Sequence, residues 1–317
     1  MTRPSATGLL LLLLAMATGC QRDTKKHIAV IPKATSHIFW LAVKAGAVSA
    51  GEKLGVEIEW NGPAAETDFA RQVQIVDSAI ARHADGIVLA ASDRKALIQV
   101  VDRAMKAGIP TTIFDSGLDS DNYTNFVATD NLEAGRMAGR EMGRLLNGKG
   151  KVAMIQNVPG SISTQDRENG FEEALAKEFP GIQMVQKLYG MSERSKSMAA
   201  AENILTAHPD LDGLFGSTEP SASGAILALN ARGRNGKVKL IGFDVNDAMV
   251  EAMRAGTLDA MVLQDPFQMG FAAVKTVVDK INGQAAPKRM DLPAVVVTKA
   301  NLDSADMQRL VKPKIAQ

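Results

Sequence analysis

The sequence predicts an α/β protein made of two doubly wound lobes, each built on a parallel sheet. Short apolar runs alternate with stretches of helical spacing, an order that favours parallel strands joined by right-handed crossovers. The run His27–Ile31 is almost wholly apolar, which is typical of a strand buried on both faces. The second half repeats the first, since Asp85–Val88 is matched by Asp212–Phe215 and Ile113–Asp115 by Gly242–Asp244. The repeat indicates two similar lobes that face each other.

The apolar runs are short and are bounded by polar or turn residues, as strands are. Strands are therefore expected at residues 27–31, 55–60, 86–90, 111–114, 151–155, 183–188, 212–217, 239–243, 260–263 and 294–297.

The segments between the strands carry apolar residues at helical spacing. Phe39, Val43 and Ala47, for example, would lie on one side of the first helix. The sequence predicts more elements than two lobes in series would need. The additional elements are the last strands and the helix between them, so we expect the chain to cross between the lobes several times. Helices are expected at residues 39–54, 69–83, 96–107, 168–179, 195–207, 223–231 and 269–281.

Composition limits the class of protein. The 317 residues are 46% hydrophobic and 22% charged, which is typical of a globular chain. The formal net charge is only +1 and no block of Lys or Arg occurs, so a nucleic-acid partner is not expected. Aromatic residues make up 4%, so the cores must be mostly aliphatic.

The N-terminus reads as a processing segment. Arg3 is followed by the apolar run Leu9–Ala17, which has the length of a signal-peptide core and is too short to span a bilayer. Cys20, the only cysteine, follows small residues as in a lipobox, although Ala17 stands where Leu is usual. We therefore expect a signal peptide over residues 1–19, lipidation of Cys20 and a tether over 20–26. The alternative is an ordinary secretory signal with an incidental cysteine.

Polar and aromatic side chains follow the predicted strands at their carboxyl ends, where ligands bind in open α/β sheets. Carboxylates and Arg form strong hydrogen bonds to hydroxyl groups, and aromatic faces cover the apolar face of a sugar ring. This set suits a neutral ligand with many hydroxyls. The candidate ligand-binding residues are His37, Phe39, Trp40, Asp115, Arg167, Thr218, Glu219, Asp244 and Gln264.

Structural roles are the alternatives for several of these residues. An Asp after a strand is often a helix N-cap or a turn residue, which applies to Asp115 and Asp244. Phe39 and Trp40 could belong to the core. Arg167 lies between two acidic residues and could form an exposed ion cluster.

Catalytic and metal-binding motifs are missing from the sequence. The histidines are scattered without the H-E-x-x-H spacing, and no G-x-S-x-G elbow, phosphate-binding loop or calcium loop occurs. We therefore expect no enzymatic activity, no cofactor and no metal.

A set of short motifs, in this order, resembles the ribose-type periplasmic sugar-binding proteins. The resemblance covers residues 27 to 300 and implies the type I periplasmic-binding-protein fold with two lobes joined by a three-strand hinge. The motifs are Ile28–Ile31 followed by Phe39-Trp40, Asp85–Ile87, Gly108–Pro110, Ile113–Asp115, Ala128–Asn131, Asp166–Phe171, Ala207–Asp210, Ile241–Asp244 and Gln264–Pro266.

The resemblance also implies boundaries and contacts. Crossovers are expected near Thr129, Gln264 and Leu292, which gives an N-terminal lobe of residues 27–129 plus 265–292 and a C-terminal lobe of 130–264 plus 293–317. Phe39 and Trp40 would sandwich the sugar ring. The side chains that would bind its hydroxyls are Asp115, Arg167, Asp244 and Gln264.

The sequence departs from the ribose pattern at several polar positions. His37 and Ala90 replace Asn, Ser116 replaces Arg, and Thr218-Glu219 replaces Asn-Asp. We therefore expect a monosaccharide other than ribose.

The leading hypothesis is an extracytoplasmic solute-binding protein of an ABC importer. It would be a monomer in the periplasm or at the cell surface, held to the membrane by its lipid, whose closed form is recognised by the membrane permease. A sensory receptor that passes its closed form to a chemoreceptor or histidine kinase is the second hypothesis. A LacI-type effector domain would need a helix-turn-helix where this chain has its signal, and an enzyme would need a nucleophile and base.

Overall fold

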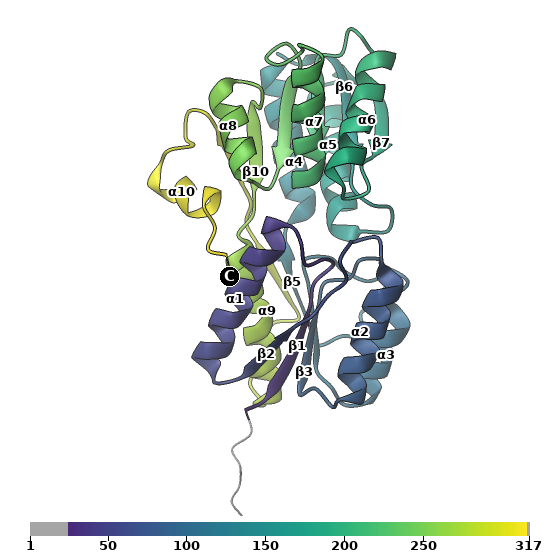
Figure 1. Ribbon diagram of the computed structural model, residues 1–317, viewed down its shortest axis with the longest axis vertical. Helices are drawn as coiled ribbons and strands as arrows, with labels where there is room; N and C mark the ends of the chain where they lie inside the picture. The colour runs from purple at the N-terminus through teal and green to yellow at the C-terminus, as the bar shows by residue number, and fades with distance from the viewer. Residues whose placement is uncertain (1–24, 316–317) are drawn as a thin grey trace, which may run out of the picture.

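The computed structural model describes residues 25–315, and its chain forms two stacked lobes (Figure 1). Cys20 and the predicted signal peptide lie outside this range. Each lobe has a six-stranded sheet with helices on both faces, so the predicted pair of doubly wound α/β lobes is confirmed. Among the described helices, none is long and apolar enough to cross a membrane.

The N-terminal lobe is built on the sheet β11-β5-β4-β3-β1-β2, in which all neighbouring strands are parallel. Helices α1 and α9 cover one face, and α2 and α3 cover the other. The strands are β1 (His27–Ile31), β2 (Glu57–Trp60), β3 (Gly86–Leu89), β4 (Thr111–Phe114), β5 (Asn125–Thr129) and β11 (Arg289–Leu292); the helices are α1 (Ile38–Leu54), α2 (Phe69–Ala81), α3 (Ile98–Lys106) and α9 (Pro266–Ile281).

The C-terminal lobe is built on the sheet β12-β10-β9-β8-β6-β7. Its edge strand β12 is antiparallel to β10, because β12 enters directly from β11 of the other lobe without a crossover helix. The strands are β6 (Lys149–Gln156), β7 (Gly181–Tyr189), β8 (Gly213–Gly216), β9 (Lys239–Phe243), β10 (Ala260–Leu263) and β12 (Val295–Thr298); the helices are α4 (Asn131–Leu145), α5 (Ile162–Glu178), α6 (Arg194–Ala207), α7 (Glu219–Ala231), α8 (Asp247–Ala255) and α10 (Ala305–Val311).

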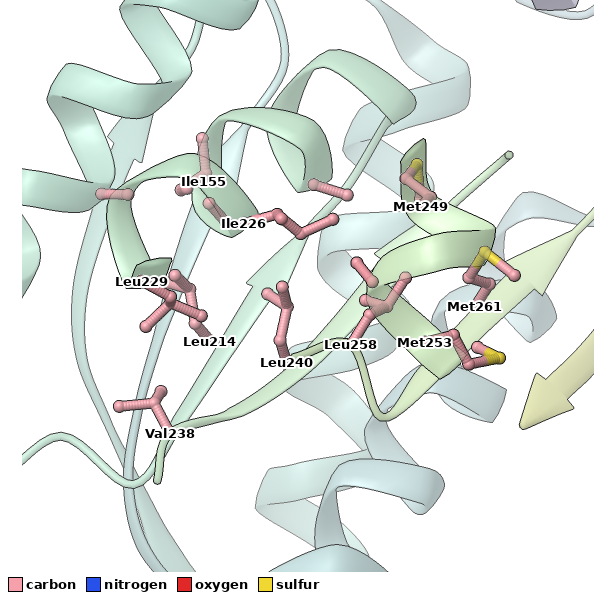
Figure 2. Close-up of a cluster of buried hydrophobic side chains, with 14 of the residues drawn as sticks. Ile155, Leu214, Ile226, Leu229, Val238, Leu240, Met249, Met253, Leu258 and Met261 are labelled. Carbon is pink, nitrogen blue, oxygen red and sulfur yellow. The ribbon is translucent and has the colours of Figure 1, made fainter. Parts of the chain in front are cut away.

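Aliphatic and Met side chains fill the core between this sheet and helices α7 and α8 (Figure 2). Leu214 and Leu240 come from the strands, Leu229 comes from α7, and Met249 and Met253 come from α8. All five side chains are fully buried. Because aromatic residues are scarce, flexible Met and branched aliphatic side chains fill this core instead.

The sequence did not predict β5, β11, α4, α8 or α10, and α5 begins earlier than expected. The α4 helix escaped detection because Gly135, Gly139 and Gly143 occupy the face that packs on α5, where apolar side chains would otherwise mark the pattern. A Cβ on Gly135 would lie 2.0 Å from the carbonyl oxygen of Arg167, and one on Gly170 would lie 2.0 Å from that of Leu132. Glycines on both helices thus let the two backbones touch.

The N-terminal lobe has the same glycine-mediated backbone contact between α1 and α9. A Cβ on Gly46 would lie 1.9 Å from the carbonyl oxygen of Phe267, and one on Gly270 would lie 2.1 Å from that of Val43. The two lobes therefore share a reciprocal glycine contact as well as a strand order. Helices α1 and α5 occupy equivalent places, since each follows the first strand of its lobe's repeat. The glycine contacts hold these two helices, which carry Trp40 and Arg167.

The chain passes between the two sheets at three places, and the last of these is the short link from β11 to β12. The other two follow β5 and β10, which end at Thr129 and Leu263. The C-terminal segment also returns toward the N-terminal lobe, where Arg309 pairs with Asp265 and the Lys314 ammonium lies over the Phe267 ring. The segments that join the lobes lie together on one side of the molecule (Figure 1).

Candidate functional site

A small cavity lies between the lobes, at the carboxyl ends of the parallel strands. All of the candidate residues predicted from the sequence line it, so the structure brings them together; that they bind a ligand stays a prediction. The cavity also includes side chains that the sequence analysis missed: Lys33, Glu66, Asn157, Ser163, Thr164, Ser192 and Pro220.

Two aspartates occupy equivalent places in the lobes. Asp115 follows β4 and Asp244 follows β9, with φ angles of 56° and 62°. Their backbone N–H groups donate to Val127 and Val262 on the next strand, at 2.9 and 3.0 Å. Neither residue is a helix N-cap in this fold, since α8 is capped by Asn246. Left-handed backbone in a non-glycine residue is costly and concentrates at functional sites, which agrees with the binding role predicted for the matched pair.

Lys33 is buried at the floor of the cavity and joins the two lobes. Its Nζ lies 2.8 Å from Asp115 Oδ2 in its own lobe. It also donates to Ser161 Oγ at 3.2 Å and to Ser163 Oγ at 2.9 Å, both at the start of α5 in the other lobe. The ammonium therefore pairs with one carboxylate and donates two hydrogen bonds to the opposite lobe.

Arg167 is buried on α5 and does not form the exposed ion cluster considered as an alternative. Its Nε donates to Asn131 Oδ1 at 2.8 Å, and Nη1 donates to the Ser217 carbonyl at 3.3 Å. The guanidinium carbon lies 3.9 Å from the centroid of the Phe243 ring, and Nη1 lies 3.9 Å from Asp244 Oδ2. Stacking and hydrogen bonds fix the guanidinium so that one edge faces the cavity.

Asp244 is connected to the crossover strands through Gln264. Gln264 Nε2 donates to Asp244 Oδ1 at 2.8 Å, and Thr129 Oγ1 donates to Gln264 Oε1 at 2.6 Å. Burial raises the pKa of Asp244 to about 6, although Arg167 and the Gln264 hydrogen bond oppose the rise. The nearby charges of Asp115 and Glu219 add to it. A carboxyl in this environment is ionised at pH 7 at a cost in folding free energy.

The predicted aromatic sandwich is wrong. The rings of Phe39 and Trp40 are edge to face, with centroids 4.8 Å apart and an interplanar angle of 83°, which leaves no room for a sugar ring between them. Consecutive residues on one helix point about 100° apart, so both rings belong to the same wall of the cavity. Trp40 is also part of the core, and its Nε1 donates to Glu66 Oε1 at 3.0 Å.

Glu66 is buried beside the cavity and is held by groups from both lobes. Asn157 Nδ2, from the C-terminal lobe, donates to its Oε2 at 3.1 Å. Burial acts to raise the pKa of Glu66, but Lys33, His37 and the hydrogen bonds from Trp40 and Asn157 together lower it below its usual value. This carboxylate is therefore charged at neutral pH.

His37 lies at the mouth of the cavity, beside the buried Glu219. His37 Nδ1 is 4.0 Å from Glu219 Oε2, and its Nε2 is 3.5 Å from Ser192 Oγ, so His37 faces the opposite lobe with both nitrogens. Glu219 Oε1 accepts hydrogen bonds from Ser223 at 2.8 Å, from Arg194 at 3.1 Å and from Asn246. Thr218 is also buried in this wall.

Some of the missed residues had a signal in the sequence. Lys33 and Asn157 follow the first strand of each lobe's repeat, so the rule that located Asp115 applies to them equally. Glu66 comes from the loop between β2 and α2, well past the end of its strand, and carries no such signal. Across residues 25–315, no group of three or more His, Cys, Asp or Glu side chains could hold a metal ion.

Residues 28–285 match the family described as periplasmic binding protein domain, and the chain belongs to this family. The chain is 29% identical over 297 residues to the D-ribose/D-allose-binding protein of Pseudomonas aeruginosa, covering 91% of this chain and 92% of that relative. The predicted resemblance is therefore confirmed. Membership also confirms the prediction of a binding protein rather than an enzyme, and of a location outside the cytoplasm.

Solved structures agree with this assignment. A carbohydrate transporter solute-binding protein from Agrobacterium radiobacter, in complex with D-arabinose, has a TM-score of 0.88 and 32% identity, covering 91% of this chain and 99% of its own. An ABC transporter solute-binding protein from Agrobacterium vitis with bound D-fucose has a TM-score of 0.87 and 37% identity, covering 90% and 99%.

The raised pKa of Asp244 predicts a pH-dependent gain in stability on replacing it. Between about pH 4 and 6 the folded protein holds a proton that the unfolded chain has released, so the stability from this group is present at low pH and is lost as pH rises. Asp244→Asn should therefore stabilise the ligand-free protein at pH 7.5 by about 1–3 kcal/mol. Urea unfolding at pH 7.5 and pH 4 measures the difference, which should shrink toward zero at pH 4. A variant less stable than wild type at pH 7.5 would contradict this account.

Proposed function

We propose that this protein binds a monosaccharide between its two lobes and delivers it to the membrane permease of an ABC importer. The observation that carries the proposal is the polar cavity between the lobes, with matched strand-end aspartates and a buried arginine fixed over an aromatic ring. Carboxylates and guanidinium groups accept and donate the paired hydrogen bonds that sugar hydroxyls make.

The relatives support the class of ligand. One is named for D-ribose and D-allose, and two structures contain D-arabinose and D-fucose, which are all monosaccharides. A single sugar ring is therefore the preferred occupant, with Asp115, Arg167, Asp244 and Gln264 on its hydroxyls.

Closure of the lobes about the crossovers near Thr129, Gln264 and Leu292 is the proposed mechanism. The lobes would be residues 27–129 plus 265–292 and residues 130–264 plus 293–317. Hydrogen bonds cross the cleft from Lys33 to Ser163 and from Asn157 to Glu66. A ligand that contacts both walls adds to these bonds only when the lobes are together, so it shifts the population toward the closed form that the permease recognises.

We also propose that Cys20 carries a lipid that holds the protein at the membrane, and that the protein acts as a monomer. The support for the anchor is the sequence alone: a positive start, an apolar run of signal-peptide length and small residues before the only cysteine.

A thermal-shift screen of the soluble form starting at Gln21 tests the binding proposal. The panel holds pentoses, hexoses, deoxy sugars, polyols and nucleosides. A sugar at 1,000 times its Kd should stabilise the native state by roughly 4 kcal/mol. That is a shift of several degrees, at roughly 2–4 °C per kcal/mol. Asp244→Ala should abolish the shift. If only a nucleoside or another solute shifts the melt, the ligand class is wrong.

Replacement of the cysteine tests the anchor. Cys20→Ala should move the protein from the membrane fraction to the soluble extracytoplasmic fraction and abolish metabolic labelling with a fatty acid, because the thiol that carries the lipid is gone. Fractionation with immunodetection measures the change, and Ala17→Leu, which restores the usual lipobox residue, is the matched control that should keep the label. Wild-type protein that is soluble and unlabelled would refute the anchor.

A further inference from the structure

The charged side chains that line the cavity do not balance. Four carboxylates, those of Glu66, Asp115, Glu219 and Asp244, face two cations, Lys33 and Arg167. Five of these side chains are buried, and that of Asp244 is only 12% exposed. Arg194 also pairs with Glu219, but its side chain is 57% exposed at the mouth, where water screens its charge. The enclosed part of the cleft therefore has more negative than positive charge.

Several acceptors in the cavity lack a hydrogen-bond donor. Lys33 pairs with Asp115 and donates to Ser161 and Ser163, and Arg167 uses two of its five N–H groups on Asn131 and Ser217. The buried Asn157 Oδ1 lines the cavity and accepts no hydrogen bond from any residue between 25 and 315.

Two carboxylate oxygens on the cavity wall have no hydrogen-bond donor among residues 25–315. Glu219 Oε2 lies 4.0 Å from His37 Nδ1, and Asp244 Oδ2 lies 3.9 Å from Arg167 Nη1. Both separations exceed hydrogen-bonding distance. The cavity thus offers acceptors that call for donors from the ligand.

We propose that the preferred ligand of this cleft carries a protonated amino group, as an amino sugar does. An ammonium brings one positive charge, which the cavity lacks, and three donors for the free acceptor oxygens. The inference rests on the proposed function, because the hydroxyl-binding residues would still hold the rest of the ring. It goes further by setting an order of affinity: the amino sugar first, its neutral parent next and the corresponding sugar acid last.

The neighbours of Asp244 support this order. Burial, together with the charges of Asp115 and Glu219, raises the pKa of Asp244, while Arg167 and Gln264 oppose the rise. A ligand cation in the cavity would favour the ionised form of this carboxyl. A ligand carboxylate would instead add a further negative charge to a site already rich in them, and desolvated like charges repel strongly.

Isothermal titration with matched sugars tests the order. The probes are D-galactose, D-galactosamine and D-galacturonate, with the gluco and manno counterparts, at pH 7 against the soluble form starting at Gln21. In the series that fits the site, the amine should bind at least about tenfold tighter than the neutral sugar, a difference of about 1.4 kcal/mol, and the uronate should not bind. A neutral sugar that binds as tightly as its amine, or more tightly, overturns the inference and leaves the proposed function intact. If no sugar of any series binds, the proposed function fails with it.

A pair of variants separates the cleft from the rest of the surface. Glu219→Gln keeps the size of the side chain and removes one negative charge, so the ratio of amine to neutral affinity should fall about tenfold. Glu251→Gln, an exposed position on α8, should leave the ratio unchanged. Equal ratios in wild type and a folded Glu219→Gln overturn the inference.

The wild-type protein gives an independent readout. Lowering the pH from 7 to 5 protonates Asp244 and removes a negative charge. The ratio of amine affinity to neutral-sugar affinity should therefore be lower at pH 5 than at pH 7. A ratio that stays constant with pH would count against the inference even if the variant does not fold.

Discussion

The structure depends on keeping ionised side chains buried between its two lobes. Each buried charge costs several kcal/mol unless partners and hydrogen bonds compensate for it. Lys33 is compensated by Asp115 and two serine hydroxyls, and Arg167 by the Phe243 ring and its hydrogen bonds. The compensation of Lys33 is divided between the lobes, because its serine partners lie on the opposite wall. The charges of the site therefore connect binding to the relative position of the lobes.

Such a site requires rigid walls, and the glycine contacts supply them. Helix α5 carries Arg167 and touches α4 backbone to backbone at Gly135, while α1 carries Trp40 and touches α9 at Gly46. Close-packed backbones leave little freedom to shift, since even one added methyl group would overlap a carbonyl oxygen. In both lobes, the helix that follows the first strand packs on the helix that enters from the other lobe. These pairs are α1 with α9 and α5 with α4. We therefore expect motion of one lobe against the other to occur in the segments that join them.

The sequence predicted the two-lobed fold and most of the cavity because both follow from strand order. The carboxyl ends of parallel strands must meet, so residues such as Asp115 and Asp244 could be placed without coordinates. The aromatic pair was placed wrongly because the sandwich was carried over from the resemblance, whereas two consecutive residues on one helix lie on the same wall. Glu66 comes from a long loop, and the antiparallel direction of β12 depends on a link between lobes. Neither leaves a periodic pattern to detect.

The central claim is that a ligand draws the lobes together about the crossovers, and an interlobe distance tests it most directly. Arg71→Cys on α2 and Lys196→Cys on α6 place one label on each lobe at exposed positions, in a form that starts at Gln21 and so has no other cysteine. Double electron–electron resonance would give the distribution of distances with and without the sugar that shifts the melt. The account predicts a shorter, narrower distribution with sugar. Tight binding with an unchanged distribution would contradict it.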